Sequence, residues 1–365
     1  MRDNTTNNTL LALGGVGALI GIGLLFTFER PPIETVQGGF RGTSMGQVYN
    51  PRTVNRLAAV NQVPPAPEPA DPGGERARDV FQNVQVLGHL SVEQFNRIMQ
   101  VMTEWIYPRE NIADGCNGCH VPGNFAAEDI YTKHVARRML QMTMALNSTW
   151  QVHTQEVGVT CWTCHRGQAV PAYVWSQQPV SSNGGGFATG PGEQNRPGRQ
   201  VGLASLPNDP FTPYLWRAEE IRMQGRDQHP RPNSRQSIQQ TEWNYALMMH
   251  MSTALGVNCT FCHNSRAFSS WEESPPQRLT AWHGIRMVRD INNTYIEPLR
   301  ERFPPHRLGP LGDTLKVNCA TCHQGVYQPM FGAPMIRDYP ELLPPPEQRR
   351  AEAPAPGLVA GPRLP

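Results

Sequence analysis

Residues 152–167 read VHTQEVGVTCWTCHRG and contain a Cys-x-x-Cys-His unit formed by Cys161, Cys164 and His165. The chain has 365 residues and eight cysteines. Every cysteine belongs to such a pair, with two residues between its members and a histidine directly behind. The three further units are Cys116, Cys119 and His120; Cys259, Cys262 and His263; and Cys319, Cys322 and His323.

The histidine behind each pair decides between the chemistries that such pairs serve. Zinc sites and redox disulfides place no demand on that position, and with 11 histidines in the chain four chance matches have odds of roughly one in a million. The pattern is typical of covalent haem attachment, in which both thiols bond to the porphyrin and the histidine is the proximal iron ligand. The sequence therefore predicts four covalently bound haem c groups. They would also complete a core for which only 39% of the residues are hydrophobic.

The N-terminus predicts a membrane anchor. Such haem attachment takes place outside the bacterial inner membrane, so the bulk of the chain is expected in the periplasm. Leu10–Phe28 is an uncharged run long enough to cross a bilayer. A cleaved signal peptide is the alternative, but the preceding residues are polar and no small-x-small cleavage site follows. We expect a short tail at 1–8 and an uncleaved transmembrane helix at 9–28.

Composition and motif spacing divide the rest of the chain. The second unit begins 45 residues after the first and the fourth begins 60 after the third, whereas 98 residues separate Cys161 from Cys259, which predicts a duplicated two-haem module. Proline-rich and glycine-rich segments predict extended connections. The expected parts are a strap at 29–85, a first module at 86–180, a linker at 181–235, a second module at 236–335 and a proline-rich tail at 336–365.

A helical stretch precedes each unit. Apolar residues recur at three- and four-residue spacings within 92–106, 129–150, 241–255 and 278–296, and the only internal glycine is Gly284. Ser91 is a helix start signal for the first stretch. Strand signals are sparse. The predicted fold is mainly α with long irregular segments: a multihaem cytochrome c built from duplicated modules of helix, loop and Cys-x-x-Cys-His, plus one transmembrane helix.

A haem that only transfers electrons needs a second axial ligand, usually methionine or histidine. Methionines at helical spacing are more often core residues than ligands, so the repeats predict one ligand per helix without choosing it. The candidates are Met99 and Met102; Met139, Met142 and Met144; Met248, Met249 and Met251; and Met287.

The stretches ARRMLQMT, GVTCWTCHRG, GVNCTFCHN and GIRMVRDIN, within a match from residue 40 to residue 325, resemble the tetrahaem cytochrome c subunits of purple-bacterial photosynthetic reaction centres. Carried over by position, the resemblance implies Met99, Met139 and Met248 as the sixth ligands of haems one to three, and His153 as that of haem four. Met102 stays an alternative for haem one, because the loop before Cys116 is a few residues longer than usual. Met287 stays an alternative for haem four.

The assignment of His153 has a geometric consequence. His153 lies eight residues before Cys161, so it reaches haem four only if haems two and four are neighbours, which predicts the order one, two, four, three. Bis-histidine ligation lowers the reduction potential relative to His/Met ligation, so haem four is expected to have a lower potential than its neighbours in the row. The remaining histidines are expected to be structural or on the surface: His89, His134, His229, His250, His283 and His306.

The resemblance implies an electron carrier of the photosynthetic inner membrane and not an enzyme. It would take electrons from a soluble cytochrome c or high-potential iron-sulfur protein and deliver them to the photo-oxidised bacteriochlorophyll pair. Implied partners are the L and M type subunits, the antenna polypeptides and indirectly the H subunit, but no nucleic acid. Many relatives carry a lipid on an N-terminal cysteine that this chain lacks, which leaves the helix as anchor. The competing hypotheses are a membrane-anchored multihaem quinol dehydrogenase or reductase, and an electron-storage chain unconnected with light.

Overall fold

A computed structural model describes residues 4–28, 34–37, 45–108, 112–179, 198–221 and 237–345. Helices dominate these ranges, and their one sheet is an antiparallel pair in which Glu34 lies opposite Tyr49. In chain order the elements, with 3-10 and π turns written η, are α1 (Asn4–Leu25), β1 (Glu34–Gln37), β2 (Gly46–Tyr49), α2 (Pro51–Val60), α3 (Ala77–Val80), α4 (Val92–Ile106), α5 (Ile112–Cys116), α6 (Tyr131–Ser148), α7 (Gln151–Thr154), α8 (Cys161–His165), η2 (Arg199–Val201), η3 (Thr212–Trp216), α9 (Ile238–Leu255), η4 (Cys259–Phe261), α10 (Gln277–Asp290), η5 (Ile291–Ile296), η6 (Glu297–Arg302), η7 (Pro305–Arg307), α11 (Cys319–His323), η8 (Pro329–Gly332), α12 (Met335–Asp338) and η9 (Pro340–Leu342).

The four helical stretches predicted from periodicity are confirmed as α4, α6, α9 and α10 with its π-helical continuation η5. The start signal at Ser91 is confirmed as well. Its hydroxyl accepts from the backbone N–H of Gln94 while the Gln94 side chain accepts from the Ser91 N–H, a reciprocal capping box. Local sequence therefore fixes where α4 begins.

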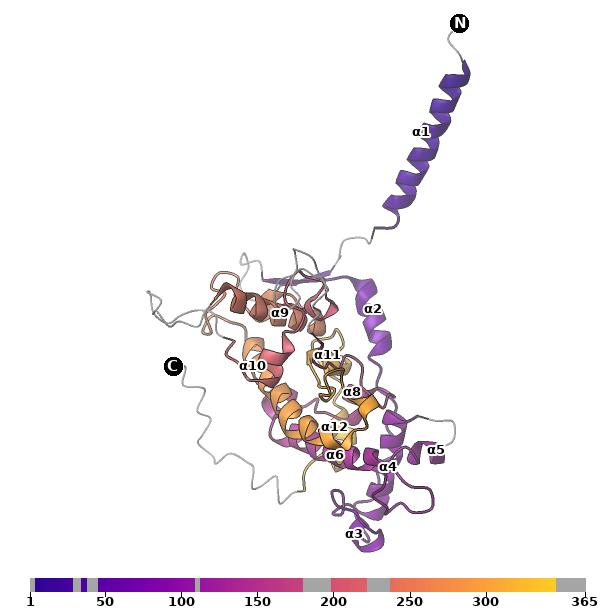
Figure 1. Cartoon of the computed structure of the whole chain (residues 1–365), viewed down its shortest axis with the longest axis vertical. Helices are drawn as coiled ribbons and strands as arrows, with labels where there is room; N and C mark the ends of the chain where they lie inside the picture. The colour runs from indigo at the N-terminus through magenta and orange to yellow at the C-terminus, as the bar shows by residue number, and fades with distance from the viewer. Residues whose placement is uncertain are drawn as a thin grey trace.

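The N-terminal helix α1 extends away from the helical body (Figure 1). Within it, Asn7–Leu25 is long and apolar enough to cross a membrane, and none of this stretch is buried against the rest of the chain. The helix begins and ends a few residues earlier than the range 9–28 expected from the sequence. Length and composition are what make it a candidate anchor.

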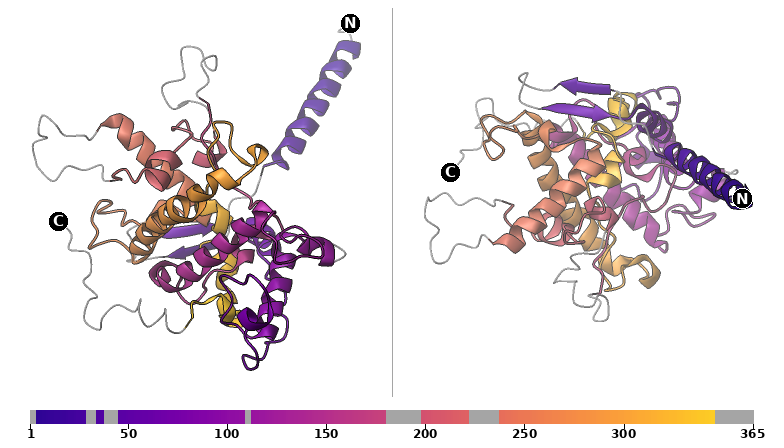
Figure 2. Two further views of the ribbon diagram at one scale, coloured as in Figure 1. Left: turned by 60° about the horizontal axis from the view of Figure 1, so that its bottom comes forward. Right: turned by 90° about the horizontal axis from the view of Figure 1, so that it is seen from above.

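The two halves of the body lie side by side, the earlier residues in purple to magenta and the later ones in orange (Figure 2). The apolar side chains form two main cores, and the second also includes Leu146 and Val159 of the first half. The first packs Ile98, Val101 and Trp105 of α4 against residues of α6. The second packs Leu247 of α9 and Ile285 of α10 among further apolar side chains.

Two segments predicted to be a linker and a tail contribute to these cores. Phe211, Tyr214 and Leu215, within the expected linker 181–235, are at most 2% exposed in the second core. Tyr339 and Leu342, within the expected tail 336–365, are at most 1% exposed in the first core. A few aromatic and leucine side chains outweigh the proline-rich composition, because each buries a large apolar area. The residues 180–197, 222–236 and 346–365 of those segments lie outside the described part of the chain.

The halves repeat one hydrogen-bond arrangement. The Asn147 side chain donates to the carbonyl of Val159 at 2.9 Å and accepts from its N–H at 2.7 Å. Asn292 makes the same pair of bonds with Val317, at 3.0 and 2.9 Å. Val159 and Val317 each stand two residues before the first cysteine of a motif. Both asparagine amides also donate to a covering segment, at Leu342 in the first half and Leu215 in the second. The segment around Leu342 and the segment around Leu215 therefore occupy equivalent positions, one on each half.

The strap crosses the body and contacts three motif regions and then α4. Its first part contacts the residues around the third and fourth motifs, and its later part contacts the second motif and then α4, which precedes the first. The contacts in chain order are Gln47 with Asn258, Leu57 with Gly325, Gln62 with Trp162, and Pro67 with Arg97.

Arg97 joins three segments, so its loss should destabilise the protein. Its guanidinium donates at 3.1 Å to both carboxylate oxygens of Glu341 and also to strap carbonyls, and the paired side chains are 6% and 2% exposed. Arg97→Met leaves a buried carboxylate unpaired, so we expect the free energy of unfolding in urea to fall by about 3–5 kcal/mol.

Two variants calibrate this measurement. Arg78→Met removes an exposed ion pair with Asp79 and should cost about 0–1 kcal/mol. The double variant Arg97→Met/Glu341→Met leaves no unpaired charge and should regain much of the loss. A single Arg97→Met variant as stable as Arg78→Met would contradict the role given to this ion pair.

Candidate haem sites

The second and fourth motifs form the short helices α8 and α11. Thr160 and Asn318 cap them, each through a reciprocal bond with the threonine three residues later. After the histidine the backbone turns left-handed, at Arg166 with φ 46° and at Gln324 with φ 48°. A glycine with positive φ follows each, and its N–H donates to the helix of the preceding unit, Gly167 to Trp105 and Gly325 to Ala254, both at 2.8 Å. Glycine suits this conformation because it has no Cβ.

All four motif histidines have the same ring orientation. Each Nδ1 lies within hydrogen-bond distance of a backbone carbonyl, which can only accept, so Nδ1 carries the proton and Nε2 is the nitrogen left for a metal. The pairs are His120 with Phe125 at 3.1 Å, His165 with Gln168 at 2.8 Å, His263 with Phe268 at 2.8 Å, and His323 with Val326 at 3.1 Å.

Burial keeps these rings neutral. Desolvation lowers the pKa of all four motif histidines, and that of His323 falls to about 4. A ligating imidazole must be neutral, so the rings are ready to bind at pH 7.

The thiols come in four Cys-x-x-Cys pairs along the chain. All eight cysteines are free thiols, and burial raises the pKa of Cys161 and Cys319 to about 12. Within the described ranges no three His, Cys, Asp or Glu side chains converge as a zinc site requires. Two thiols and one imidazole with a free Nε2 per motif fit covalent haem attachment.

The second and fourth motifs are neighbours in space. The sulfur atoms of Cys164 and Cys322 lie 2.7 Å apart, and Arg166 donates to the carbonyl of Cys322 at 3.2 Å. The predicted proximity of these two sites is therefore present in the fold, although 158 residues separate the two cysteines.

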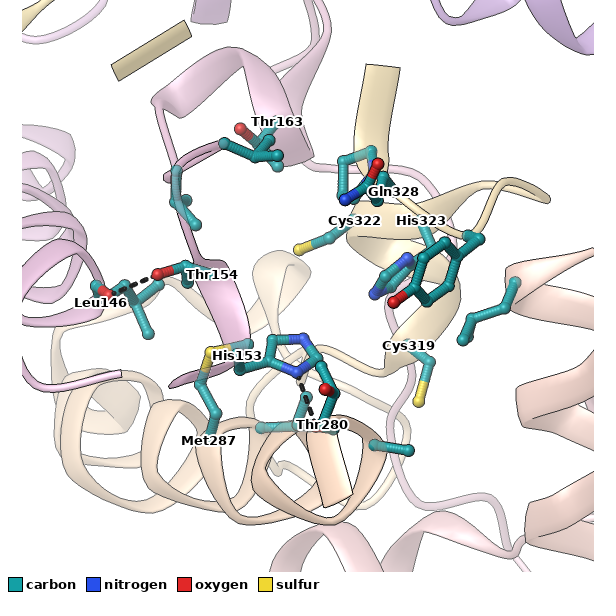
Figure 3. A pocket seen from close by; sticks show the side chains of 18 of the residues that line it. Leu146, His153, Thr154, Thr163, Thr280, Met287, Cys319, Cys322, His323 and Gln328 are labelled. Carbon is teal, nitrogen blue, oxygen red and sulfur yellow. Dashed lines mark hydrogen bonds between the residues drawn. The ribbon is translucent and has the colours of Figure 1, made fainter. Parts of the chain in front are cut away.

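A cavity of about 110 Å³ lies beside α11 and is lined by His153, Cys319, Cys322, His323, Gly284 and Met287 among others. Figure 3 shows His153 and His323 facing each other across it, with Met287 beside His153. His153 comes from α7, in the first half, and His323 from α11, in the second. The cavity therefore brings together residues from both halves.

The spacing of these two rings suits a shared iron. Their centroids lie 6.1 Å apart at an interplanar angle of 75°. Two imidazoles that bind one metal from opposite sides, each with a metal–nitrogen bond of about 2 Å, have centroids roughly 6 Å apart. Nδ1 of His153 lies 2.9 Å from the carbonyl oxygen of Thr280, so its Nε2 is also left free (Figure 3). Burial lowers the pKa of His153, which favours the neutral ligand form.

Met102 is buried, whereas Met99 is half-buried. Met102 belongs to the buried stripe of α4 and packs in the first core. Met99 shares a helix face with Thr103, one turn later, because residues four apart lie above one another. The Thr103 hydroxyl lies 4.0 Å from the sulfur of Cys116. The part of α4 that bears Met99 and Thr103 lies near the first motif, but Met99 also packs against the first core, so the choice between Met99 and Met102 stays a prediction.

The other methionines are placed less directly. Met139 of α6 and Met248 of α9 are half-buried at the edge of the second core, on the helices that precede the second and third motifs. Met287 is buried in that core and also lines the cavity. These positions do not test whether Met139 and Met248 bind iron, so their ligand roles stay predictions.

Two positioning residues escaped the sequence analysis. Thr280 offers a backbone carbonyl, which no side-chain pattern reveals. Gly284 lies against the His153 ring, and a glycine inside an otherwise unbroken helical pattern was the available signal.

Residues 29–343 match the family described as "Photosynthetic reaction centre cytochrome C subunit". The chain belongs to this family. It is 48% identical over 336 residues to the photosynthetic reaction center cytochrome c subunit of Rubrivivax gelatinosus, covering 92% of this chain and 90% of that protein. The subunit of Thermochromatium tepidum is 49% identical over 87% of this chain and 77% of its own length. That of Roseobacter denitrificans is 38% identical over 93% and 95%.

Membership of the reaction centre cytochrome c family implies covalently bound haem c. The matched range includes all four Cys-x-x-Cys-His motifs and His153, together with both covering segments. It begins after α1, so the resemblance of the body to this family does not depend on the candidate anchor.

His250 is a buried histidine outside the predicted ligand set, and it should make stability depend on pH. Its Nδ1 lies 3.1 Å from the carbonyl oxygen of Gln200, its ring packs edge-on against Phe211, and burial lowers its pKa to about 4. Between the unfolded value near 6.5 and about 4, the unfolded chain binds the proton and the folded chain does not. Stability should therefore fall as pH falls through this window, by about 3 kcal/mol in total.

The measurement is the urea unfolding free energy of the full haem-bearing chain at pH 7, 5.5 and 4. His250→Asn keeps a donor toward Gln200 but cannot titrate, so its curve should lack this contribution. His306→Asn, at an exposed 3-10 turn, is the matched control and should keep it. Equal pH dependence in His250→Asn and in the unsubstituted chain would contradict the assignment.

Proposed function

We propose that the chain carries electrons through four covalently bound haem c groups, from a soluble periplasmic donor to the photo-oxidised bacteriochlorophyll pair of a photosynthetic reaction centre. Haem supplies reversible one-electron chemistry at its iron when bound. The observation that carries the proposal is the fourfold unit of two thiols and an imidazole whose Nδ1 is tied to the backbone. The family, and relatives named as reaction centre cytochrome c subunits, support the photosynthetic context.

Thioether bonds would form at the eight motif cysteines. The proposed axial pairs are His120 with Met99, His165 with Met139, His263 with Met248, and His323 with His153. With both axial positions filled at every iron no substrate could bind there, so the subunit would be a carrier and not an enzyme. A quinol dehydrogenase or reductase would need an iron with an open position, and the 6.1 Å spacing of His153 and His323 argues for two protein ligands at the site where it is seen.

Two independent contacts support the order one, two, four, three for the sites. The sulfurs of Cys164 and Cys322 are adjacent, as neighbouring second and fourth sites require. The strap meets the residues of the third, fourth and second motifs and then α4, in that order along the chain. The strap, with α2 in its middle, thus meets these regions in the order expected for the same row counted from its other end.

The chain's own residues would set the properties of each site. They hold neutral imidazoles in fixed orientations, exclude water through the two cores, and choose between imidazole and thioether as second ligand. A thioether raises the potential of the iron relative to a second imidazole, so the proposed site with His153 would be the low step of the row.

The location follows from α1 and from the family. The helix would anchor the subunit in the photosynthetic membrane with the body in the periplasm. Proposed partners are the L and M type subunits, the antenna polypeptides, and the H subunit indirectly. A soluble cytochrome c or a high-potential iron-sulfur protein would be the donor, through the small and partly electrostatic contact usual for transient redox partners.

Flash spectroscopy tests the proposed function. Membranes that contain the complex should show bacteriochlorophyll oxidation after a single flash, followed by re-reduction with simultaneous oxidation of a c-type haem of this chain. Membranes from a strain lacking the chain should lose the haem signal and re-reduce the pair more slowly. The storage hypothesis would instead be supported if the haem absorbance did not respond to the flash and the protein did not co-purify with bacteriochlorophyll.

A histidine substitution tests the proposed ligand. In a redox titration followed by absorbance, His153→Ala should remove or shift one of four components, and one haem should become reactive toward carbon monoxide. The component assigned to haem two should stay in place, although His153 is near that motif in sequence. His283→Ala changes a neighbouring histidine of α10 and should leave all four components unchanged. Four unchanged components in His153→Ala would refute the ligand assignment.

A further inference from the structure

Gly284 lies inside α10 and needs an explanation. Glycine in a helix interior costs about 0.5–1 kcal/mol relative to alanine, and this residue has no left-handed backbone that would require it. A Cβ at this position would lie 2.5 Å from Cε1, 2.9 Å from Nδ1 and 3.2 Å from Nε2 of His153. The imidazole therefore occupies the space that a side chain at 284 would fill.

The ring has little freedom to move aside. Its Nδ1 is bonded to the carbonyl of Thr280, one helical turn before Gly284 on α10. On its other side His153 faces His323 across the cavity. The glycine thus lets the imidazole lie directly on the helix backbone. From this position its Nε2 can face the iron that His153 and His323 are proposed to share.

The internal repeat shows what the first half places at the equivalent position. Asn147 and Asn292 make identical bonds to the residues before the second and fourth motifs, which fixes the register between the two helices. Eight residues before Asn147 stands Met139, and eight residues before Asn292 stands Gly284. In this register Met287 corresponds to Met142, and not to Met139 as the similar stretches ARRM and GIRM suggest.

We propose that Gly284 is the positioning residue that gives the fourth centre its second histidine. The glycine does this in two ways: it removes the methionine that the helix would otherwise present at this position, and it opens the slot that His153 enters from the other half of the molecule. Met287, at the Met142 position, packs in the core. The inference rests on the proposed function, because it takes His153 and His323 as ligands of one haem.

Restoring a side chain tests the slot. Gly284→Ala in the full haem-bearing chain should keep four attached haems by mass, but the methyl group should displace the imidazole. We expect the lowest-potential component to shift in a redox titration, and one haem of four to become reactive toward carbon monoxide. Gly46→Ala is the control, since its methyl would make only ordinary contact with Thr35, at 3.4 Å, and should change nothing. Unchanged components in Gly284→Ala would overturn the proposal.

Replacing the histidine ligand by a methionine tests the register between the two helices. The same variant provides a second test if Gly284→Ala does not accumulate in cells. In His153→Ala/Gly284→Met the new thioether stands where the first half has Met139. We expect it to close the site, so that carbon monoxide no longer binds and the thioether-to-iron charge-transfer band grows by one haem. The potential of that component should exceed the wild-type value. Carbon monoxide binding equal to that of His153→Ala alone would overturn the proposal.

The variants distinguish an error in the ligand assignment of His153 from an error in the role of Gly284. If His153→Ala disturbs one component while both Gly284 variants behave like their controls, the ligand assignment stands and the role of Gly284 is overturned. If His153→Ala disturbs none, the ligand assignment is wrong and the role of Gly284 falls with it. The flash experiment on the reaction centre complex is independent of both results.

Discussion

The side chain of His153 is the constraint on which the arrangement depends, because it crosses from one half of the molecule to the other. Its ring faces His323 at a centroid distance of 6.1 Å, while its Nδ1 is held by the Thr280 carbonyl. An imidazole reaches only a few ångströms from its backbone, so the second and fourth motifs must be neighbours. The adjacent sulfurs of Cys164 and Cys322 show the same closeness from the thiol side.

The two halves of the molecule repeat one hydrogen-bond arrangement but cover it with different segments of the chain. Asn147 and Asn292 bind the residues before the second and fourth motifs in the same way, and each also holds a covering segment. In the second half the covering segment is η3, which comes before its helices in the chain, and in the first half it is the C-terminal segment around Leu342, which comes last. The two halves therefore share these hydrogen bonds, while the covering residues come from different places in the chain.

The strap completes the assembly by contacting the regions of the third, fourth and second motifs and then α4. Proline favours the extended conformation that lets few residues span a long path. Its contacts run from Gln47 at Asn258 to Pro67 at Arg97, where Glu341 of the C-terminal segment also binds. One buried guanidinium thus joins the strap, α4 and the end of the described chain. The irregular segments hold the helices in their relative positions, and the helices carry the proposed methionine ligands.

The sequence alone determined the local features: four attachment motifs, four helices with their start signals, and an apolar N-terminal helix. These depend on periodicity and on adjacent residues, and resemblance to a family added the prediction that His153 is a ligand. Only the tertiary structure decided the contacts of His153 with Thr280 and Gly284, the approach of Thr103 to Cys116, and the burial of Tyr214 and Leu342 in segments that composition predicts to be irregular. Contacts between distant residues leave no fixed spacing in the chain, because packing and not covalent proximity selects them.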